Sequence, residues 1–348
     1  MSNPVLVDVQ RGGVTESFHQ GAFAVVDATG TVVHALGNID RAIFPRSAVK
    51  VLQALPLITS GAADLFQLTD TELALACASH GGEPAHAATA AGMLAKAGVD
   101  ATALGCGSHW PSHDRSSREL ARSGGEPTAL HNNCSGKHAG FVCLGCLLAR
   151  EQGLDARGFL SGYVQPDHPV MQQVTHALAT ATSTDLRQAP VGVDGCSIPT
   201  FGMPLRQLAL GFARVATGQG LSADHARAAA RLRKAVAKAP FMVAGTDRFD
   251  TDVMAHFGER VFCKVGAEGV YCAALPELGW GVAIKMDDGN NARAVEVVMS
   301  HLLATWVARN EADHAVLAPR TTVHMRNWNG IEVGTLQPSA ALRAATEA

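Results

Sequence analysis

The chain has 348 residues, of which 47% are hydrophobic and 17% charged, and its 28 basic and 31 acidic residues give a formal net charge of −3. This apolar content excludes disorder as the main state, because burying it offsets the entropy lost on ordering. The nearly balanced charge argues against nucleic acid or an anionic membrane as the main partner. We therefore expect chemistry on a small molecule.

No segment of the sequence predicts export or membrane insertion. The first ten residues lack the basic and apolar regions of a secretory signal. The most apolar stretch without a formal charge, residues 138–149, is shorter than the roughly 20 residues that a transmembrane helix needs. We expect a soluble, cytoplasmic protein whose eight cysteines are reduced and mostly serve packing.

Strands are predicted at the start of the chain and a helical region after them. Val5–Val9, Ala22–Val26 and Thr31–Val33 are rich in β-branched residues, and Asp27–Gly30 is a turn. Arg46–Ile58 has apolar residues at helical spacing.

The middle of the chain is predicted to be mostly helical. Thr69–Glu72 is typical of a helix cap before Leu73–Ala76. The stretch 105–133 is expected to be loop-rich. Further helices are expected over Pro84–Ala97, from Lys137 to Arg150 and over Leu221–Ala237.

The C-terminal part returns to strands. They are expected over Arg260–Val265, Gly269–Ala274 and Gly281–Lys285, followed by a helix over Ala292–Ala308 and a hairpin over Val323–Val333. Strands flanking a helical middle favour an α+β fold, with an antiparallel sheet from both chain ends packed with a helical lobe.

We therefore expect a single two-lobed domain over residues 1–348. Its strand-rich lobe covers about 1–45 and 258–340, and its helical lobe about 46–257. The active site is expected at the seam between the lobes.

The first chemical motif is a Ser-x-x-Lys pair, Ser47 and Lys50. A spacing of three places both side chains on one helical face. A serine hydroxyl needs a base to become a nucleophile, and a lysine can serve when apolar surroundings lower its pKa. Alone, the motif also fits a capping serine and a surface lysine.

Two further segments strengthen this interpretation. Ser79 and His80 precede a glycine pair that allows close backbone approach to a ligand. Lys264 lies in a predicted apolar strand and forms a Lys-x-Gly motif, which lines the site in Ser-x-x-Lys acyl enzymes. A helix C-cap and an edge-strand lysine are the simpler alternatives.

A possible metal site follows from Cys134, His138 and Cys196. The first two have the i, i+4 spacing of a helix, and Cys196 would complete a zinc site. Cys143 and Cys146 lie in an apolar segment and are expected to pack in the core.

Together these motifs resemble the rhizobial-type, or class 3, L-asparaginase family, the zinc-containing serine–lysine amidohydrolases. The resemblance covers about residues 11–290 and continues to about residue 334. The matching segments are RGGVTESFHQGAFAVVDATGTVV, RSAVKVLQALPL, CASHGGE, NNCSGKHAG, DHPV, VDGCSIPT, MVAGTDRFD, CKVGAEGVY, KMDDGN and RNWNGIEVG.

The resemblance implies a fold similar to serine β-lactamases and serine glutaminases, and a homodimer. It implies catalytic roles for Ser47 paired with Lys50, and for Ser79 paired with Lys264. It also implies that Zn²⁺ is held by Cys134, Lys137 and Cys196, with Lys137 replacing His138 in the set. Candidate substrate-binding residues are Arg46, His80, Asp194 and Arg248.

The expected reaction is hydrolysis of the L-asparagine side-chain amide to L-aspartate and ammonia. Ser47 is the first choice of nucleophile and Ser79 the relay hydroxyl, although these roles can be exchanged. Alternatives are another Ser-x-x-Lys acyl hydrolase (a β-lactamase, peptidase or glutaminase), a self-cleaving enzyme cut at Gly245–Thr246, and a non-catalytic zinc-binding protein.

Overall fold

The computed structural model describes residues 2–291 and 293–347, which form two compact units. Unit 1 comprises Met1–Ala48, Gly202–Gln219 and Arg260–Ala348. Unit 2 comprises Val49–Phe201 and Gly220–Glu259.

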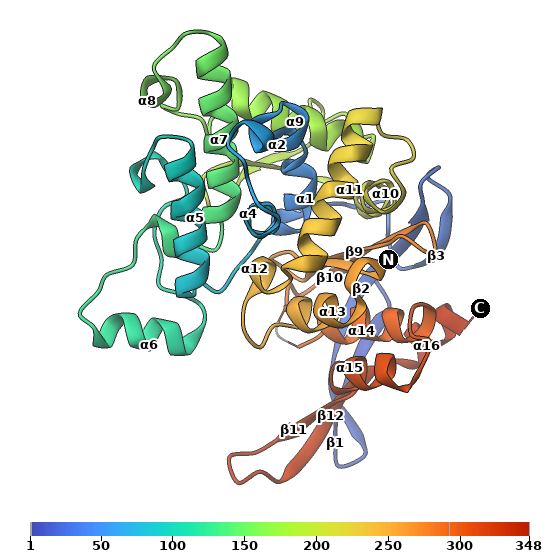
Figure 1. Ribbon diagram of the computed structural model, residues 1–348. Coiled ribbons are helices and arrows are strands. Elements are labelled where there is room, and N and C mark those ends of the chain that lie inside the picture. The colour runs from blue at the N-terminus through green and yellow to red at the C-terminus, as the bar shows by residue number, and fades with distance from the viewer. Residues whose placement is uncertain (1, 292, 348) are drawn as a thin grey trace. The chain divides into compact units, whose positions relative to one another are not determined.

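Unit 1 is built on an antiparallel sheet that contains strands from both ends of the chain (Figure 1). Among the described residues this sheet has eight strands in the order β11-β12-β1-β2-β10-β9-β8, with β3 also paired to β2. The expected α+β class, with a sheet from both chain ends, is confirmed. The strands are β1 (Val5–Arg11), β2 (Val14–Asp27), β3 (Val32–Leu36), β8 (Phe262–Val265), β9 (Val270–Leu275), β10 (Trp280–Met286), β11 (Val323–Arg326) and β12 (Glu332–Pro338).

Helices cover both faces of this sheet. Gly281 faces helix α10 (Leu205–Thr217) so closely that a Cβ there would lie 2.0 Å from the Ala209 carbonyl oxygen. Phe23 contacts Trp306 of α14 (Val295–Trp306), with ring centroids 6.4 Å apart. Residues 281 and 284 point to opposite faces, and Ile284 is paired with Phe23, so α10 and α14 lie on opposite faces. Covering both faces explains why Ala22–Val26 is a continuous buried run.

The remaining elements of unit 1 are short or peripheral. They are β4 (Ala42–Ile43), β7 (Met203–Pro204), α15 (Glu311–Thr321) and α16 (Ala340–Glu347). The hairpin of β11 and β12 matches the one expected around Trp328–Gly330. The start expected for the α14 helix, Ala292, lies outside the described residues.

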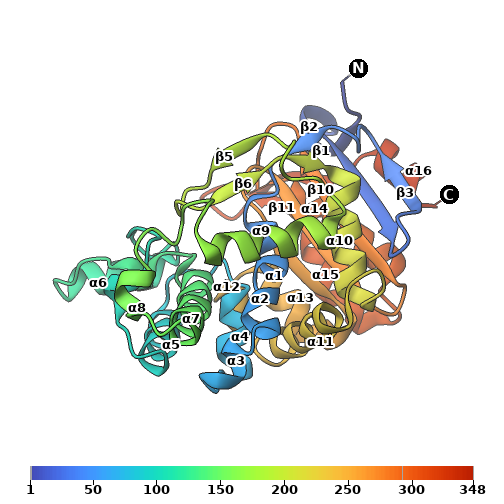
Figure 2. The same ribbon diagram turned by 90° about the horizontal axis from the view of Figure 1, so that it is seen from above.

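Unit 2 is mainly helical and is organised around α7 (Ser135–Glu151), of whose seventeen residues all but Leu148, Arg150 and Glu151 are buried (Figure 2). Around it pack α4 (Asp70–Ala76), α5 (Pro84–Lys96) and α9 (Pro169–Thr182). The other elements are α1 (Lys50–Gln53), α2 (Leu55–Thr59), α3 (Ala62–Leu65), α6 (Asp114–Arg122), α8 (Ala156–Phe159), β5 (Val191–Val193), β6 (Pro199–Phe201), α11 (Ala223–Lys238), α12 (Phe241–Ala244) and α13 (Phe249–Phe257).

One expectation for the helical middle is wrong. The single helix over Arg46–Ile58 is broken into a 3₁₀ turn (Arg46–Val49), α1 and α2. Pro56, in the first turn of α2, has no N–H to continue the preceding helix. The stretch 105–133 is loop-rich, as expected, and also contains α6, whose only apolar residues are Leu120 and Ala121.

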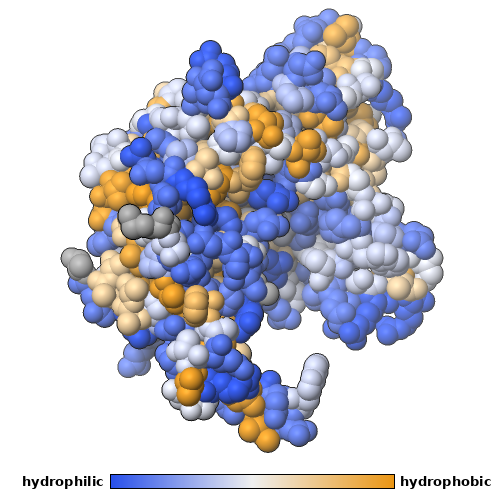
Figure 3. All heavy atoms as spheres, turned by 180° about the vertical axis from the view of Figure 1, so that it is seen from behind, coloured by the Kyte–Doolittle hydropathy of each residue, from blue (hydrophilic) through white to orange (hydrophobic). Residues whose placement is uncertain are grey.

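Among the residues described, no helix is both long and apolar enough to cross a membrane. On the face of the molecule seen in Figure 3, hydrophobic residues occur in scattered patches among hydrophilic ones.

Candidate active site

Lys50 and Ser79 form a buried hydrogen-bonded pair in unit 2. Lys50 is fully buried, and its Nζ donates to Ser79 Oγ over 2.8 Å. The same Nζ donates to the carbonyl oxygens of Ala78 at 2.5 Å and Asn133 at 3.4 Å. Three acceptors match the three protons of an ammonium group, so Lys50 is held in one position against the serine hydroxyl.

Helix ends in unit 2 position this pair. The capping box between Thr69 and Glu72 fixes the start of α4, which ends just before Ser79. Gly136, at the start of α7, approaches the end of α4 so closely that a Cβ would lie 2.4 Å from the Leu75 carbonyl oxygen. This approach places the residues that precede α7 beside Ser79 and Lys50.

Cys134 is one of the residues that precede α7, and it lies near two other side chains, Lys137 and Cys196, that could bind a metal ion with it. Cys134 precedes α7, Lys137 lies in its first turn, and Cys196 follows β5. Lys137 Nζ donates to Cys196 Sγ over 2.9 Å, and all three side chains are buried. Cys196 Sγ also lies 3.7 Å from the Asp194 carboxylate.

The electrostatics of this cluster favour a thiolate at Cys134. The hydrogen bond from Cys196 keeps the pKa of the Cys134 thiol well below its usual value, and the positive charge of Lys137 adds to this against the effect of burial. By contrast, burial raises the pKa of Cys143 to about 12. Cys143 is therefore a packing residue, as expected, whereas Cys134 has the character of a metal ligand.

His138 turns away from the cysteine pair. Its Nδ1 lies 2.6 Å from the Tyr163 hydroxyl, which itself accepts a hydrogen bond from the Gly105 N–H. Tyr163 therefore donates to Nδ1. Burial, with the charge of Lys137, holds the pKa of His138 well below its usual value. The structure thus brings Lys137, rather than His138, to Cys196.

No group of three or more His, Cys, Asp or Glu side chains gathers in a metal-binding arrangement among the residues described. The donor set here is two sulfurs and one amine. That set fits a zinc ion, because thiolates are preferred ligands and an amine can bind once it loses its proton.

Unit 1 carries three of the other expected residues. Arg46 and Ser47 are half-buried in the 3₁₀ turn, and Lys264 is fully buried in β8. Lys264 Nζ donates to the Val265 carbonyl oxygen over 2.7 Å. Because Lys264 lies two residues after Phe262, which stacks on Phe212 of α10, its side chain is on the α10 face of the sheet.

Backbone strain accompanies these residues. Three of the non-glycine residues with a left-handed φ are adjacent to expected site residues or belong to them: Arg46, Ser197 and Asp247. Such conformations cost about 1–3 kcal/mol and persist where surrounding structure enforces them, often at functional sites.

The two remaining candidates have different surroundings. His80 is fully buried, accepts from the Gly82 N–H over 3.1 Å, and lies with Nε2 3.0 Å from Ser135 Oγ. It therefore holds the start of α7. Arg248 is half-buried at the N-cap of α13.

Sequence reasoning missed the partners that hold these groups. Lys50 donates to the backbone carbonyl of Asn133, and a backbone acceptor leaves no signal in the amino-acid sequence. Tyr163 and Glu83 are separated from their partners by long stretches of chain. Glu83 lies in the quoted segment CASHGGE and accepts from Thr246 N and Oγ1 at 2.8 and 2.7 Å.

Solved structures resemble this chain at low identity. A β-lactamase from Mycobacterium bovis matches with 16% identity and a TM-score of 0.36, over 86% of this chain and 95% of that one. Mglu in its native form matches with 16% identity and a TM-score of 0.33, over 79% of this chain and 62% of that one. This chain therefore spans less than two thirds of that Mglu chain. No curated protein matches the chain.

One protein-family model matches almost the whole length of this chain. The model of the L-asparaginase II family covers residues 7–338, which include all the expected site residues of both units. This chain belongs to the L-asparaginase II family and is an amidohydrolase.

Proposed function

We propose that this enzyme hydrolyses the side-chain amide of L-asparagine to L-aspartate and ammonia through a lysine-activated serine. Membership of the L-asparaginase II family supports the substrate. The observation that carries the mechanism is the buried Lys50–Ser79 hydrogen bond, because an enclosed lysine held against a hydroxyl can exchange a proton with it.

In the proposed reaction Ser47 Oγ attacks the amide carbon. For this step Lys50 acts as a neutral amine: it takes the proton of Ser47 and passes one of its own through Ser79 to the amide nitrogen. The C–N bond then breaks and ammonia leaves. Water then cleaves the resulting ester and the serine regains its proton. Lys264 supplies positive charge that keeps the relay polarised. The same residues support the exchange of roles in which Ser79 is the nucleophile.

Cys134, Lys137 and Cys196 would hold a zinc ion, for the reasons of donor type and burial given above. When bound, zinc would supply positive charge that helps to orient the charged end of the substrate. Asp194 lies beside this set and is proposed to contact substrate or bound water. Arg248 is proposed to supply positive charge to the substrate pocket. We further propose that the enzyme is a cytoplasmic homodimer.

The test is ammonia release from L-asparagine and L-glutamine measured side by side, with and without a chelator. Release from L-asparagine that the chelator lowers is expected. Greater release from L-glutamine would make the enzyme a glutaminase, and rapid hydrolysis of nitrocefin would favour the β-lactamase alternative. If neither amide releases ammonia, the result would favour the alternative of a non-catalytic zinc-binding protein.

A further inference from the structure

Arg46 and Glu268 are two strained residues that face each other in unit 1. Both have left-handed backbones, with φ of 51° and 58°. Arg46 Nη1 lies 3.9 Å from Glu268 Oε1, at the outer limit of an ion pair. Because neither residue type favours this conformation, surrounding contacts must impose it.

Those contacts belong to the turn between β8 and β9. Gly266 packs so closely on the chain before Arg46 that a Cβ there would lie 2.8 Å from the Pro45 carbonyl oxygen. Asn291 bridges the two ends of the turn, donating to the Gly266 carbonyl oxygen over 2.5 Å and accepting from the Gly269 N–H. The turn is therefore fixed beside the residue that precedes Ser47.

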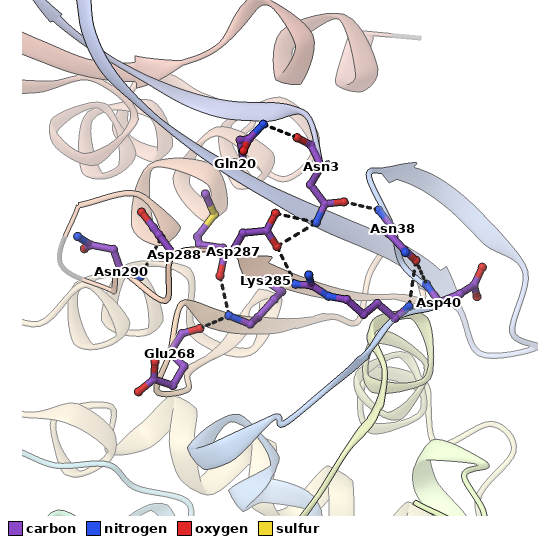
Figure 4. A network of polar contacts seen from close by, with 11 residues as sticks. Asn3, Gln20, Asn38, Asp40, Glu268, Lys285, Asp287, Asp288 and Asn290 are labelled. Carbon is purple, nitrogen blue, oxygen red and sulfur yellow. Dashed lines mark hydrogen bonds and ion pairs between the residues drawn. The ribbon is translucent and has the colours of Figure 1, made fainter. Parts of the chain in front are cut away.

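Lys285 holds the same turn through its backbone. Its Nζ donates over 2.6 Å to the carbonyl oxygens of Glu268 and of Met286 (Figure 4). The Glu268 carboxylate points away from Lys285 in this view. The lysine thus sets the position of Glu268 and leaves its carboxylate for another cation.

The carboxylate itself is accessible. The Glu268 side chain is 67% exposed, and its Oε2 is only 2.7 Å from where a Cβ on Gly289 would lie. Glycine at 289 therefore leaves the room that the carboxylate occupies. Because the ion pair is 3.9 Å long and Glu268 is mostly exposed, the contact between the two side chains contributes little, so a ligand can replace it at small cost.

We propose that Glu268 binds the α-ammonium group of the substrate, while Arg46 binds its α-carboxylate. An α-amino acid carries both charges on neighbouring atoms, and Arg46 and Glu268 present the complementary charges side by side. This proposal rests on the proposed function. It makes Glu268 a specificity residue that selects amides with an α-amino group.

The experiment compares L-asparagine with succinamic acid, which is L-asparagine without its α-amino group, used as substrate or as competitive inhibitor. Glu268→Gln removes the charge at nearly constant size. The kcat/KM of this variant for L-asparagine is expected to fall about tenfold through a higher KM. Its kcat/KM or inhibition constant for succinamic acid should stay within about twofold of the wild-type value. Glu268→Asp, which keeps the charge, should recover part of the loss.

Glu277→Gln is the matched control, since Glu277 pairs with Arg309 elsewhere in unit 1. It should leave both constants unchanged. Equal losses for both compounds in Glu268→Gln, or no loss for L-asparagine, would overturn the role of Glu268 alone. Failure of the wild-type enzyme to release ammonia from L-asparagine would instead overturn the proposed function, and this role with it.

Discussion

Lys50 Nζ lies 2.8 Å from Ser79 Oγ, with the lysine fully buried and its Nζ also donating to the backbone carbonyls of Ala78 and Asn133. This contact joins the end of α4 to the start of α1. A buried ammonium that lost any of its acceptors would be costly, so the geometry of the pair is strongly determined.

Replacing Lys50 tests its role in proton transfer. Lys50→Met keeps the length of the side chain and removes the amine, so ammonia release from L-asparagine should fall about 10²- to 10⁴-fold. Circular dichroism should show a folded protein, although the orphaned carbonyls lower its stability by about 1–3 kcal/mol. Lys238→Met is the control, because Lys238 pairs with Asp70 on the surface of the same unit. Comparable activity in both variants would exclude proton transfer through Lys50.

The zinc proposal is tested by metal content. Cys134→Ser should purify with much less zinc per chain than the wild type, because a serine hydroxyl is a poor replacement for a thiolate. Cys143→Ser changes a buried thiol within α7 that is not in the donor set, and should keep its zinc. Equal zinc content in the two variants, measured by mass spectrometry of the metal, would show that Cys134 is not a ligand.

The packing of helices in unit 2 predicts opposite effects on stability when two of its glycines are replaced by alanine. Gly136→Ala forces a methyl group against Leu75 and should destabilise by about 1–3 kcal/mol. Gly92→Ala, in α5, meets only Glu72 Oε1 at 3.9 Å and should stabilise by about 0.5–1 kcal/mol. Urea unfolding of both variants measures the difference, and a neutral Gly136→Ala would contradict the close packing of α7 on α4.

Stability should fall at mildly acid pH because of His301 in α14. Burial, with the nearby charge of Arg343, lowers its pKa from 6.5 to about 4 in the folded state. The unfolded chain therefore binds more protons between these values, so the stability is complete above pH 6.5 and is lost as the pH falls toward 4.

Urea midpoints at pH 7.5 and 5 measure this effect. The pKa shift of His301 sets an upper limit of about 3 kcal/mol on its contribution to the free energy of unfolding. The actual contribution is smaller, because the ring is partly exposed to solvent. His301→Asn, which retains a polar group near Thr346, should show a smaller difference between the two pH values. An unchanged difference would show that other groups cause the loss.

The sequence predicts the sheet well because its strands have a direct local signal. Ala22–Val26 and Gly281–Lys285 are apolar runs bounded by turns, and both form central strands. α6 has no such signal, because its only apolar residues are Leu120 and Ala121, and it is supported by i,i+4 ion pairs such as Arg115–Glu119.

The site is predictable in its residue types and less so in its contacts. The Ser-x-x-Lys motif identifies Lys50, but the hydrogen bond to Ser79 joins residues 29 positions apart and depends on how α4 ends. Spacing alone favours His138 over Lys137 as a partner of Cys134. Only the fold shows that His138 turns to Tyr163 and that Lys137 reaches Cys196.

The most direct test of the account is ammonia release from L-asparagine by the wild type and by Ser47→Ala, with Ser79→Ala measured alongside. We predict that the wild type releases ammonia and that Ser47→Ala loses at least about 10³-fold in kcat while remaining folded. A greater loss in Ser79→Ala would indicate that Ser79 is the nucleophile and Ser47 the relay hydroxyl. Near-normal turnover by both variants would contradict the serine–lysine mechanism.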